Sequence, residues 1–284
     1  MASAVNPVNL YAGSLCTSDS WCGRHVSVLL IVDPLRTLLW YVARTALLPE
    51  LLRQLARQIR GKQPYHRLDA LARCEAQAIS VDDALGYFGS DHRCDDTDSD
   101  LRRYERAAKE RVSSIEGLMG GGANLDLLYG LARSLKPQKV LETGVAFGWS
   151  TLALLSATRD TTNSRVVSVD MPYVKRNLRK LVGAVVPEDL RQRWTLIRRA
   201  DREGIPKALR ILDGLDFAHY DSDKTPEGRL FSYPLIWKSL RPGGVLISDD
   251  ISDNTAFFRF SEDIGVKPIV IALDDKFAGV LVKP

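Results

Sequence analysis

Two acidic segments of the sequence could together bind a cation. Asp221 directly follows the apolar run Leu215–Tyr220, and the pair Asp249 and Asp250 follows the apolar run at residues 244–248. If the two runs are neighbouring parallel strands, the three carboxylates meet at one edge of the sheet, where they repel one another unless protons or a cation neutralise them. Oxygen ligands of this kind suit Mg²⁺, Ca²⁺ or Mn²⁺ rather than zinc. The pattern therefore predicts a divalent cation held by these three residues, with Mg²⁺ as the expected ion.

Lys224 lies three residues after Asp221 and could act as a base at such a site. A bound cation lowers the pKa of a hydroxyl group that coordinates it, as it does for water. A lysine whose own pKa is depressed by burial or by the cation is neutral and can accept the released proton. We therefore expect Asp221 and Lys224 to be catalytic. The alternative is that Asp249 and Asp250 only cap the segment that follows them and that Lys224 is solvated.

A glycine-containing loop follows the apolar run Lys139–Thr143 and indicates a nucleoside-type ligand. The residues expected to contact that ligand are Glu142, Gly144, Ala146, Phe147, Gly148 and Ser150. The glycines allow a tight turn and a close approach of the backbone to a ligand. Their GxxxG spacing differs from the GxGxxG that cradles a pyrophosphate, which disfavours a dinucleotide. A plain strand-to-helix turn is the alternative.

Acidic residues after the next two expected strands suit the same kind of cofactor. Asp170, followed by Met171, could accept hydrogen bonds from both hydroxyls of a ribose, because a carboxylate is an acceptor with two oxygens. Ala200 and Asp201 come after the third strand, and Asp201 could accept a hydrogen bond from an adenine amino group. Each of the two aspartates could instead be a helix N-cap.

The elements that would position these residues alternate between strand-like and helical segments from about residue 101. Helices are expected at residues 101–118 and 124–135. The expected strands are Lys139–Thr143, Arg165–Val169, 194–198, Leu215–Tyr220, 244–248, 267–273 and 276–282. This alternation predicts an α/β fold with a mostly parallel sheet covered on both faces, and the last two strands predict a closing antiparallel hairpin. Ligands of such sheets bind beyond the carboxyl ends of the strands, where all the residues above are expected.

From about residue 115 to Pro284, the sequence resembles the cation-dependent O-methyltransferases typified by the catechol and caffeoyl-CoA enzymes. Related bacterial natural-product O-methyltransferases are similar too. The shared motifs are the E-x-G-x-x-x-G-x-S loop from Glu142 to Ser150, the acidic residue Asp170 with Met171, the D-x-x-K segment from Asp221 to Lys224, and the pair Asp249 and Asp250, which is Asp-Asn in the family. The resemblance covers some three fifths of the chain.

The resemblance implies a Rossmann-like, doubly wound sheet of seven strands that binds S-adenosylmethionine and moves its methyl group to a hydroxyl of a small molecule. It further implies that Glu142 lies near the cationic methionine portion, that Asp170 binds the ribose and that Lys224 is the base. Asp250 in place of asparagine adds charge and leaves the metal requirement open, so a metal-independent methyltransferase is the alternative. The spacing of the glycines argues against a nicotinamide-dependent oxidoreductase, and the intact acidic residues argue against a non-catalytic scaffold.

Residues 1–100 lie outside this resemblance and are expected to form a helical N-terminal extension with an acidic linker, followed by a methyltransferase domain at residues 101–284. Within the extension, residues 26–60 are apolar and then amphipathic, with arginines largely off the apolar face. This segment could cap the active site, form a homodimer contact or lie peripherally on a membrane surface. Charged residues interrupt it too often for a membrane-spanning helix.

Composition narrows the range of partners. A net charge of +4, from 39 basic and 35 acidic residues, is too small to indicate a nucleic-acid partner. The four cysteines lack CxxC spacing, which predicts reduced thiols in a cytoplasmic protein rather than a zinc site. No basic region precedes the first apolar stretch, so a signal peptide is not expected. A hydroxylated small molecule remains the expected substrate.

Overall fold

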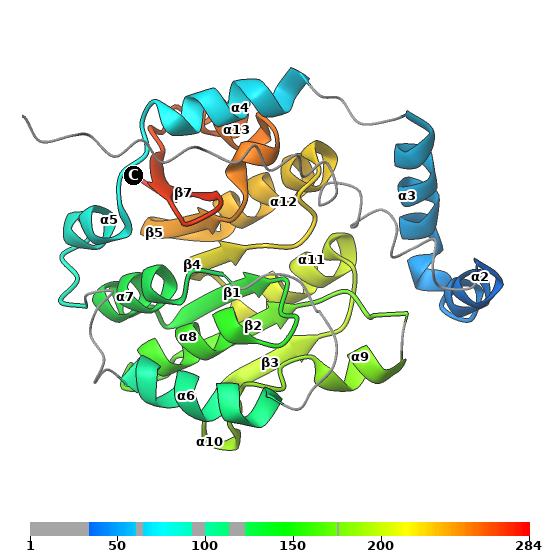
Figure 1. The fold of residues 1–284 in the computed structure, drawn as a ribbon, viewed down its shortest axis with the longest axis horizontal. Helices are drawn as coiled ribbons and strands as arrows, with labels where there is room; N and C mark the ends of the chain where they lie inside the picture. Colours follow the sequence, from blue (N-terminus) through cyan, green and yellow to red (C-terminus); the bar gives the residue numbers. More distant parts are fainter. Residues whose placement is uncertain (1–33, 61–64, 93–99, 114–122, 175) are drawn as a thin grey trace, which may run out of the picture. The chain divides into compact units, whose positions relative to one another are not determined.

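The computed structural model describes residues 34–60, 65–92, 100–113, 123–174 and 176–284. The chain divides into two compact units, Met1–Leu52 and Arg53–Pro284. The first unit contains helix α2 (Pro34–Val42), the 3-10 turn η1 (Thr45–Leu47) and the start of helix α3 (Leu48–Arg60). The second unit contains the rest of α3, the sheet and the other helices of the described residues (Figure 1). None of the described helices is both long and apolar enough to cross a membrane.

The second unit is built on one seven-stranded sheet. Its strands are β1 (Lys139–Thr143), β2 (Arg165–Val169), β3 (Trp194–Ile197), β4 (Leu215–Tyr220), β5 (Leu240–Ser248), β6 (Ile269–Ala272) and β7 (Phe277–Val282). Their order is β3-β2-β1-β4-β5-β7-β6. The first five strands run parallel, whereas β7 is antiparallel to both β5 and β6. The expected α/β fold with a closing hairpin is confirmed, and the hairpin places the last strand inside the sheet, next to β5.

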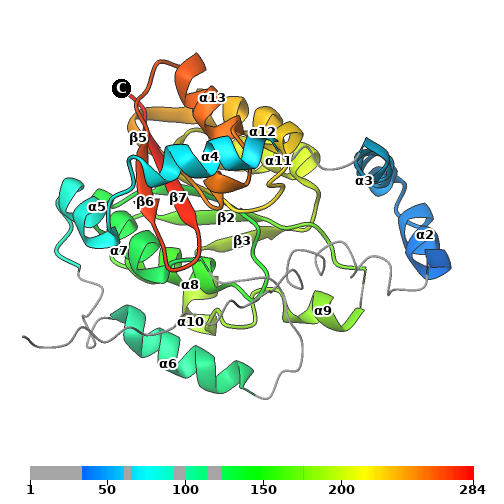
Figure 2. The same ribbon diagram turned by 45° about the horizontal axis from the view of Figure 1, so that its top comes forward.

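Helices cover both faces of the sheet (Figures 1 and 2). One face packs against α5 (Val81–Tyr87), α6 (Asp100–Val112), α7 (Leu125–Leu135) and α8 (Trp149–Ala157). The other face packs against α4 (Tyr65–Glu75), α11 (Asp201–Leu212), α12 (Pro226–Ser239) and α13 (Ala256–Asp263). Three short elements complete the unit: α9 (Arg176–Leu181), α10 (Glu188–Arg191) and η2 (Ile251–Asp253).

The central strands are apolar on both faces because both faces are covered. Successive side chains of a strand point to opposite faces. Val140 and Phe217 accordingly join the core under α7 and α8, while Leu141 and Ala218 join the core under α11 and α12. The same alternation places Glu142 and His219, which are register partners on β1 and β4, on the α8 face.

Two helices that precede residue 101, the expected start of the second domain, belong to the second compact unit. Helices α4 and α5 pack on the sheet: Cys74 is buried in one core and Leu85 in the other. Between them, Ile79 forms a β-bridge to Ile271 of β6. These helices are short, and their apolar residues alone do not indicate that they pack on the sheet. The sequence pattern therefore places them in the N-terminal extension.

Several expected features fall outside the described residues. These are the apolar run at 26–32, the acidic stretch at 93–99, the end of the helix expected at 101–118, the glycines at 120–122, and Cys16, Cys22 and Cys94. Cys74, which is described, is a free and buried thiol.

Candidate active site

The loops that follow the central strands are tied together at the carboxyl edge of the sheet. The amide of Asp221 donates a 3.0 Å hydrogen bond to the carbonyl of Thr143, and the amide of Asp249 donates one of 3.0 Å to the carbonyl of Tyr220. On the other side, the amide of Gly144 bonds to the carbonyl of Val169 at 2.9 Å. Because β4 and β5 are neighbours in the sheet, Asp221 and Asp249 come together as the sequence predicts.

The glycine loop after β1 depends on close backbone packing. Gly144 has φ +80, and a Cβ at this position would lie 2.2 Å from the carbonyl oxygen of Asp221. Gly148 has φ +94, and a Cβ there would lie 2.9 Å from the Cα of Gly183. The carbonyl of Ala146, itself at φ +49, accepts a hydrogen bond from the amide of Gly183. The absence of a Cβ at the two loop glycines therefore allows close contact with neighbouring backbone as well as the tight turn itself.

Glu142 lies beneath this loop and is fully buried. Its carboxylate accepts hydrogen bonds from the hydroxyls of Ser150 at 2.6 Å, Thr151 at 2.7 Å and Ser168 at 2.5 Å. Burial raises its pKa to about 7, although the three hydroxyls favour the charged form. Glu142 thus anchors the start of α8 through Ser150 and Thr151, and its place beside a cationic ligand stays a prediction.

Replacing Glu142 with glutamine is expected to change how stability depends on pH. The carboxyl ionises near pH 4.5 in the unfolded chain and near 7 in the folded one, so its contribution is present below the lower value and is lost as the pH rises through the higher one. The free energy of unfolding of the wild type relative to Glu142→Gln should therefore fall by up to roughly 3 kcal/mol across this window. Urea unfolding at several pH values measures it, and a difference independent of pH would contradict the assignment.

A cavity of about 430 Å³ opens at this edge, a size suited to a small-molecule ligand. Its lining includes Gly144, Ala146, Phe147 and Ser150 of the loop, Asp170 after β2, and Asp221 and Lys224 after β4. Glu105 and Lys109 of α6 also line it, although no sequence motif singled them out. The sequence-predicted residues from three strand ends thus share one cavity.

Asp170 is placed to accept hydrogen bonds from a ligand in this cavity. Its Oδ1 accepts a 3.1 Å hydrogen bond from the amide of Val145. Its buried Oδ2 has no hydrogen-bond partner, and the nearest guanidinium nitrogen of Arg198 is 3.7 Å away. Burial raises the pKa of Asp170. An unsatisfied buried carboxylate oxygen beside a cavity fits the hydroxyls of a ribose.

Three other residues expected at the cofactor do not line this cavity. Met171, Ala200 and Asp201 are not among the described residues that line the cavity. Asp201 instead accepts a 2.5 Å hydrogen bond from the hydroxyl of Ser222, and burial raises its pKa to about 6. Through Ser222, Asp201 supports the loop after β4, which also contains the cavity residue Asp221.

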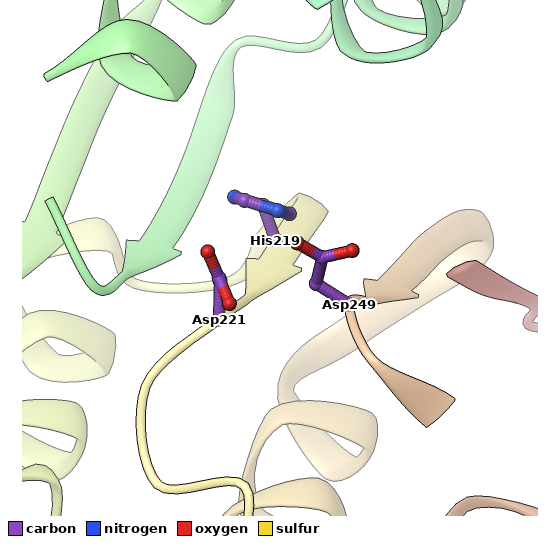
Figure 3. Close-up of side chains that lie close together, drawn as sticks. All are labelled: His219, Asp221 and Asp249. Atoms are coloured by element: carbon purple, nitrogen blue, oxygen red, sulfur yellow. The ribbon is translucent and has the colours of Figure 1, made fainter. Parts of the chain in front are cut away.

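His219 joins the acidic residues, and the sequence did not single it out. The ligand atoms of His219, Asp221 and Asp249 all lie within 4.8 Å of one another at the ends of β4 and β5 (Figure 3). His219 is 2% exposed, its Nδ1 has no hydrogen-bond partner, and burial lowers its pKa to about 4, so the imidazole is neutral. The sequence does contain one indication of its role. His219 lies two residues before Asp221, so the two side chains point to the same face of the sheet. Asp250 is outside this group.

Two lysines already pair with the three aspartates. Lys224 Nζ lies 2.8 Å from Asp221 Oδ1 and also contacts Asp250 Oδ2, and Lys276 Nζ lies 2.6 Å from Asp249 Oδ2. Burial alone would lower the pKa of each lysine, but the carboxylates outweigh it and raise both. Lys224 is thus charged, opposite to what a basic role requires. With these ammonium groups in place, the residues do not fit a resident divalent cation, whose charge would lie against two positive ones.

Known proteins resemble this chain in one sequence segment and in fold. Residues 141–251 match the family described as Methyltransferase domain. Rv0187 from MTB, solved with its cofactor, is similar in fold with 17% identity, 67% of this chain and 93% of that chain covered, and a TM-score of 0.50. A methyltransferase from Geobacter sulfurreducens is 17% identical, with 66% of this chain and 90% of that chain covered and a TM-score of 0.50. An O-methyltransferase from Bacillus cereus in complex with SAH is 17% identical, with 67% of this chain and 93% of that chain covered and a TM-score of 0.49.

None of the curated proteins compared matches the chain in sequence. The structural likeness, at these identities, concerns the fold, while the family match concerns the segment from β1 to η2 that contains the glycine loop and the acidic cluster. Residues 141–251, about two fifths of the chain, therefore match a methyltransferase domain, and the seven-stranded fold that contains them is similar to that of solved methyltransferases.

Proposed function

We propose that this protein transfers the methyl group of S-adenosylmethionine to a hydroxyl oxygen of a small molecule. The observation that carries the proposal is the shared cavity. One part of its wall is the glycine loop with Asp170, which suits a nucleoside, and another is Asp221 with Lys224, which suits a reacting hydroxyl. A methyltransferase domain match over the same residues supports the assignment.

The residues present fit the cofactor. Asp170 Oδ2 would accept from the ribose hydroxyls, and the tight turn at Gly144 lets the loop backbone approach the ligand. When bound, S-adenosylmethionine supplies an electrophilic methyl group on a positively charged sulfur. The protein has to hold the acceptor hydroxyl in line with that methyl group and exclude water, which the loop and α6 side chains around the cavity would do.

The hydroxyl must lose its proton as the new oxygen–carbon bond forms and the sulfur–carbon bond breaks. Asp221 lines the cavity and is the carboxylate best placed to accept this proton, because burial raises its pKa toward that of a useful base. The ammonium group of Lys224, 2.8 Å from Asp221 Oδ1, would stabilise negative charge on the acceptor oxygen. Lys224 then acts by its charge rather than by taking the proton.

Two parts of the sequence-based expectation remain predictions. One is whether Asp221, Asp249 and Asp250 hold a divalent cation or the enzyme is independent of metal, and the pairing of these carboxylates with lysines favours independence. The other is a dimer or peripheral membrane contact through residues 26–60. Leu52 and Leu55 of α3 are exposed, in keeping with either contact.

Calorimetry with S-adenosylmethionine and, separately, with NADH tests the cofactor. We expect the first to bind and the second not to. Asp170→Ala should weaken S-adenosylmethionine binding by roughly 10- to 100-fold, because it removes hydrogen bonds to a charged group. Asp160→Ala, at a side chain that is 73% exposed, is the matched control and should bind normally. Absence of S-adenosylmethionine binding to the wild type would refute the proposal.

The acceptor can be sought by incubating the protein with isotope-labelled S-adenosylmethionine and a panel of hydroxylated compounds. Label transferred to oxygen, with and without Mg²⁺, identifies the substrate class. Transfer only to nitrogen or carbon acceptors would contradict O-methylation while leaving the methyltransferase assignment intact.

A further inference from the structure

The acidic cluster at the ends of β4 and β5 is surrounded by fixed positive charge. Lys224 pairs with Asp221 and Asp250, and Lys276 pairs with Asp249. Behind them, the fully buried Arg229 donates hydrogen bonds to the backbone carbonyls of Asp249 at 3.0 Å and Asp250 at 2.7 Å. Three cationic side chains therefore contact the three acidic residues that the sequence assigned to a divalent cation.

Lys276 differs from the other two because it comes from the hairpin between β6 and β7. It precedes β7, and its carbonyl accepts a 2.9 Å hydrogen bond from the amide of Leu273, which closes the hairpin turn. Pairing of β7 with β5, in which Gly279 is opposite Ser248, brings this turn beside the end of β5. The position of the ammonium group is thus set by the sheet itself.

The Lys276–Asp249 pair is held in a largely dry environment. The side chain of Asp249 is 4% exposed and that of Lys276 is 19% exposed, and their charged atoms are 2.6 Å apart. A buried carboxylate that loses its partner is left with an uncompensated charge, which is strongly unfavourable. A divalent cation placed between His219, Asp221 and Asp249 would lie against the Lys276 ammonium group and be repelled by it.

We propose that Lys276 takes the place of the divalent cation among these carboxylates, so that the site works without a bound metal. The amino group supplies permanently, from within the chain, the positive charge that the resemblance to cation-dependent enzymes assigns to an ion. The catalytic meaning of this replacement rests on the proposed methyl transfer, but the exclusion of the metal is a property of the site that can be measured by itself.

Removal of the ammonium group should open the site to a metal. We expect the wild-type chain, titrated with Mn²⁺ and followed by calorimetry and electron paramagnetic resonance, to show no binding that depends on Asp249. Lys276→Met should bind one Mn²⁺ per chain at least about tenfold more tightly, a change that corresponds to about 1.4 kcal/mol. Addition of Asp249→Asn to Lys276→Met should abolish the new site. Lys276→Arg retains the charge and should behave like the wild type.

Thermal unfolding gives a second readout of the same variants. A ligand that binds only the folded state raises the melting temperature in a concentration-dependent way. Mn²⁺ should therefore raise the Tm of Lys276→Met and leave that of the wild type and of Lys276→Arg unchanged. A purely structural role for Lys276 would lower the Tm of Lys276→Met without making it respond to Mn²⁺.

The wild type alone can overturn the proposal, whatever the folding of the variants. Mn²⁺ binding to the wild type that disappears in Asp249→Asn would show that the lysine does not exclude the ion. Failure of a folded Lys276→Met to bind Mn²⁺ would also refute it. These results need neither cofactor nor acceptor, so they are distinguishable from failure of the proposed function, which would appear as absence of S-adenosylmethionine binding.

Discussion

Replacement of Gly144 with alanine is expected to abolish binding of S-adenosylmethionine. A Cβ at this position would lie 2.2 Å from the backbone carbonyl oxygen of Asp221, and backbone cannot move aside as a flexible side chain can. The loop after β1 and the loop after β4 would have to separate, and both line the cavity. We expect a loss of stability of roughly 1–2 kcal/mol from the left-handed φ and roughly 1–3 kcal/mol from overpacking. Calorimetry and denaturant unfolding measure the two effects.

Gly243→Ala is a matched control for this variant. Gly243 has φ +78, close to the φ +80 of Gly144, but a Cβ there would have no atom within 4 Å. It should therefore show the cost of the left-handed backbone without the clash, and cofactor binding should stay within about twofold of the wild type, a free-energy change well below the 1.4 kcal/mol of a tenfold effect. Equal loss of cofactor binding in both variants would mean that the contact between the two loops is not what shapes the site.

Asp221→Asn is expected to reduce methyl transfer by roughly 100- to 10,000-fold, the range found when a group that moves a proton in the transition state is lost. Asparagine fills the same space but cannot accept a proton, and it no longer balances the charge of Lys224. Cofactor binding should change little, because Asp170 and the glycine loop remain. Single-turnover transfer at saturating labelled S-adenosylmethionine separates the two effects.

Asp263→Asn provides the control for charge. Asp263 is exposed at the end of α13 and does not line the cavity, so this variant loses one carboxylate without touching the site. It should transfer methyl groups at the wild-type rate. Transfer by Asp221→Asn that matches this control would exclude a role for Asp221 in proton removal and direct attention to the neutral imidazole of His219.

The sheet was predictable from sequence because its central strands are covered on both faces and are therefore mostly apolar. β1, β2 and β4 begin and end at the expected residues, the errors at β3, β6 and β7 are of one or two residues, and β5 begins at Leu240 rather than at residue 244. What local patterns do not contain is the order of strands. The last hairpin was expected, but nothing in its residues says that β7 enters the sheet beside β5.

Because local patterns do not contain the order of the strands, the sequence reveals some site residues and not others. Asp221 and Lys224 are near one another in sequence and follow a single strand, so their motif reveals them. Lys276 reaches Asp249 only because of the position of β7, and no spacing rule connects two residues 27 positions apart. Glu142 shows the converse: its motif is visible in the sequence, whereas its hydrogen bonds to three buried hydroxyls are visible only in the structure.

The bridge at Ile79 has a consequence for how the protein avoids association with other chains. β6 is the last strand of the sheet, and the outer edge of such a strand can recruit a strand from another molecule. Here the amide of Ile79 bonds to the carbonyl of Val270 and the amide of Ala272 bonds to the carbonyl of Ile79, both at 2.9 Å. The strand is four residues long and follows Pro268. The segment between α4 and α5 thus blocks this edge, which protects the folded protein from edge-to-edge aggregation.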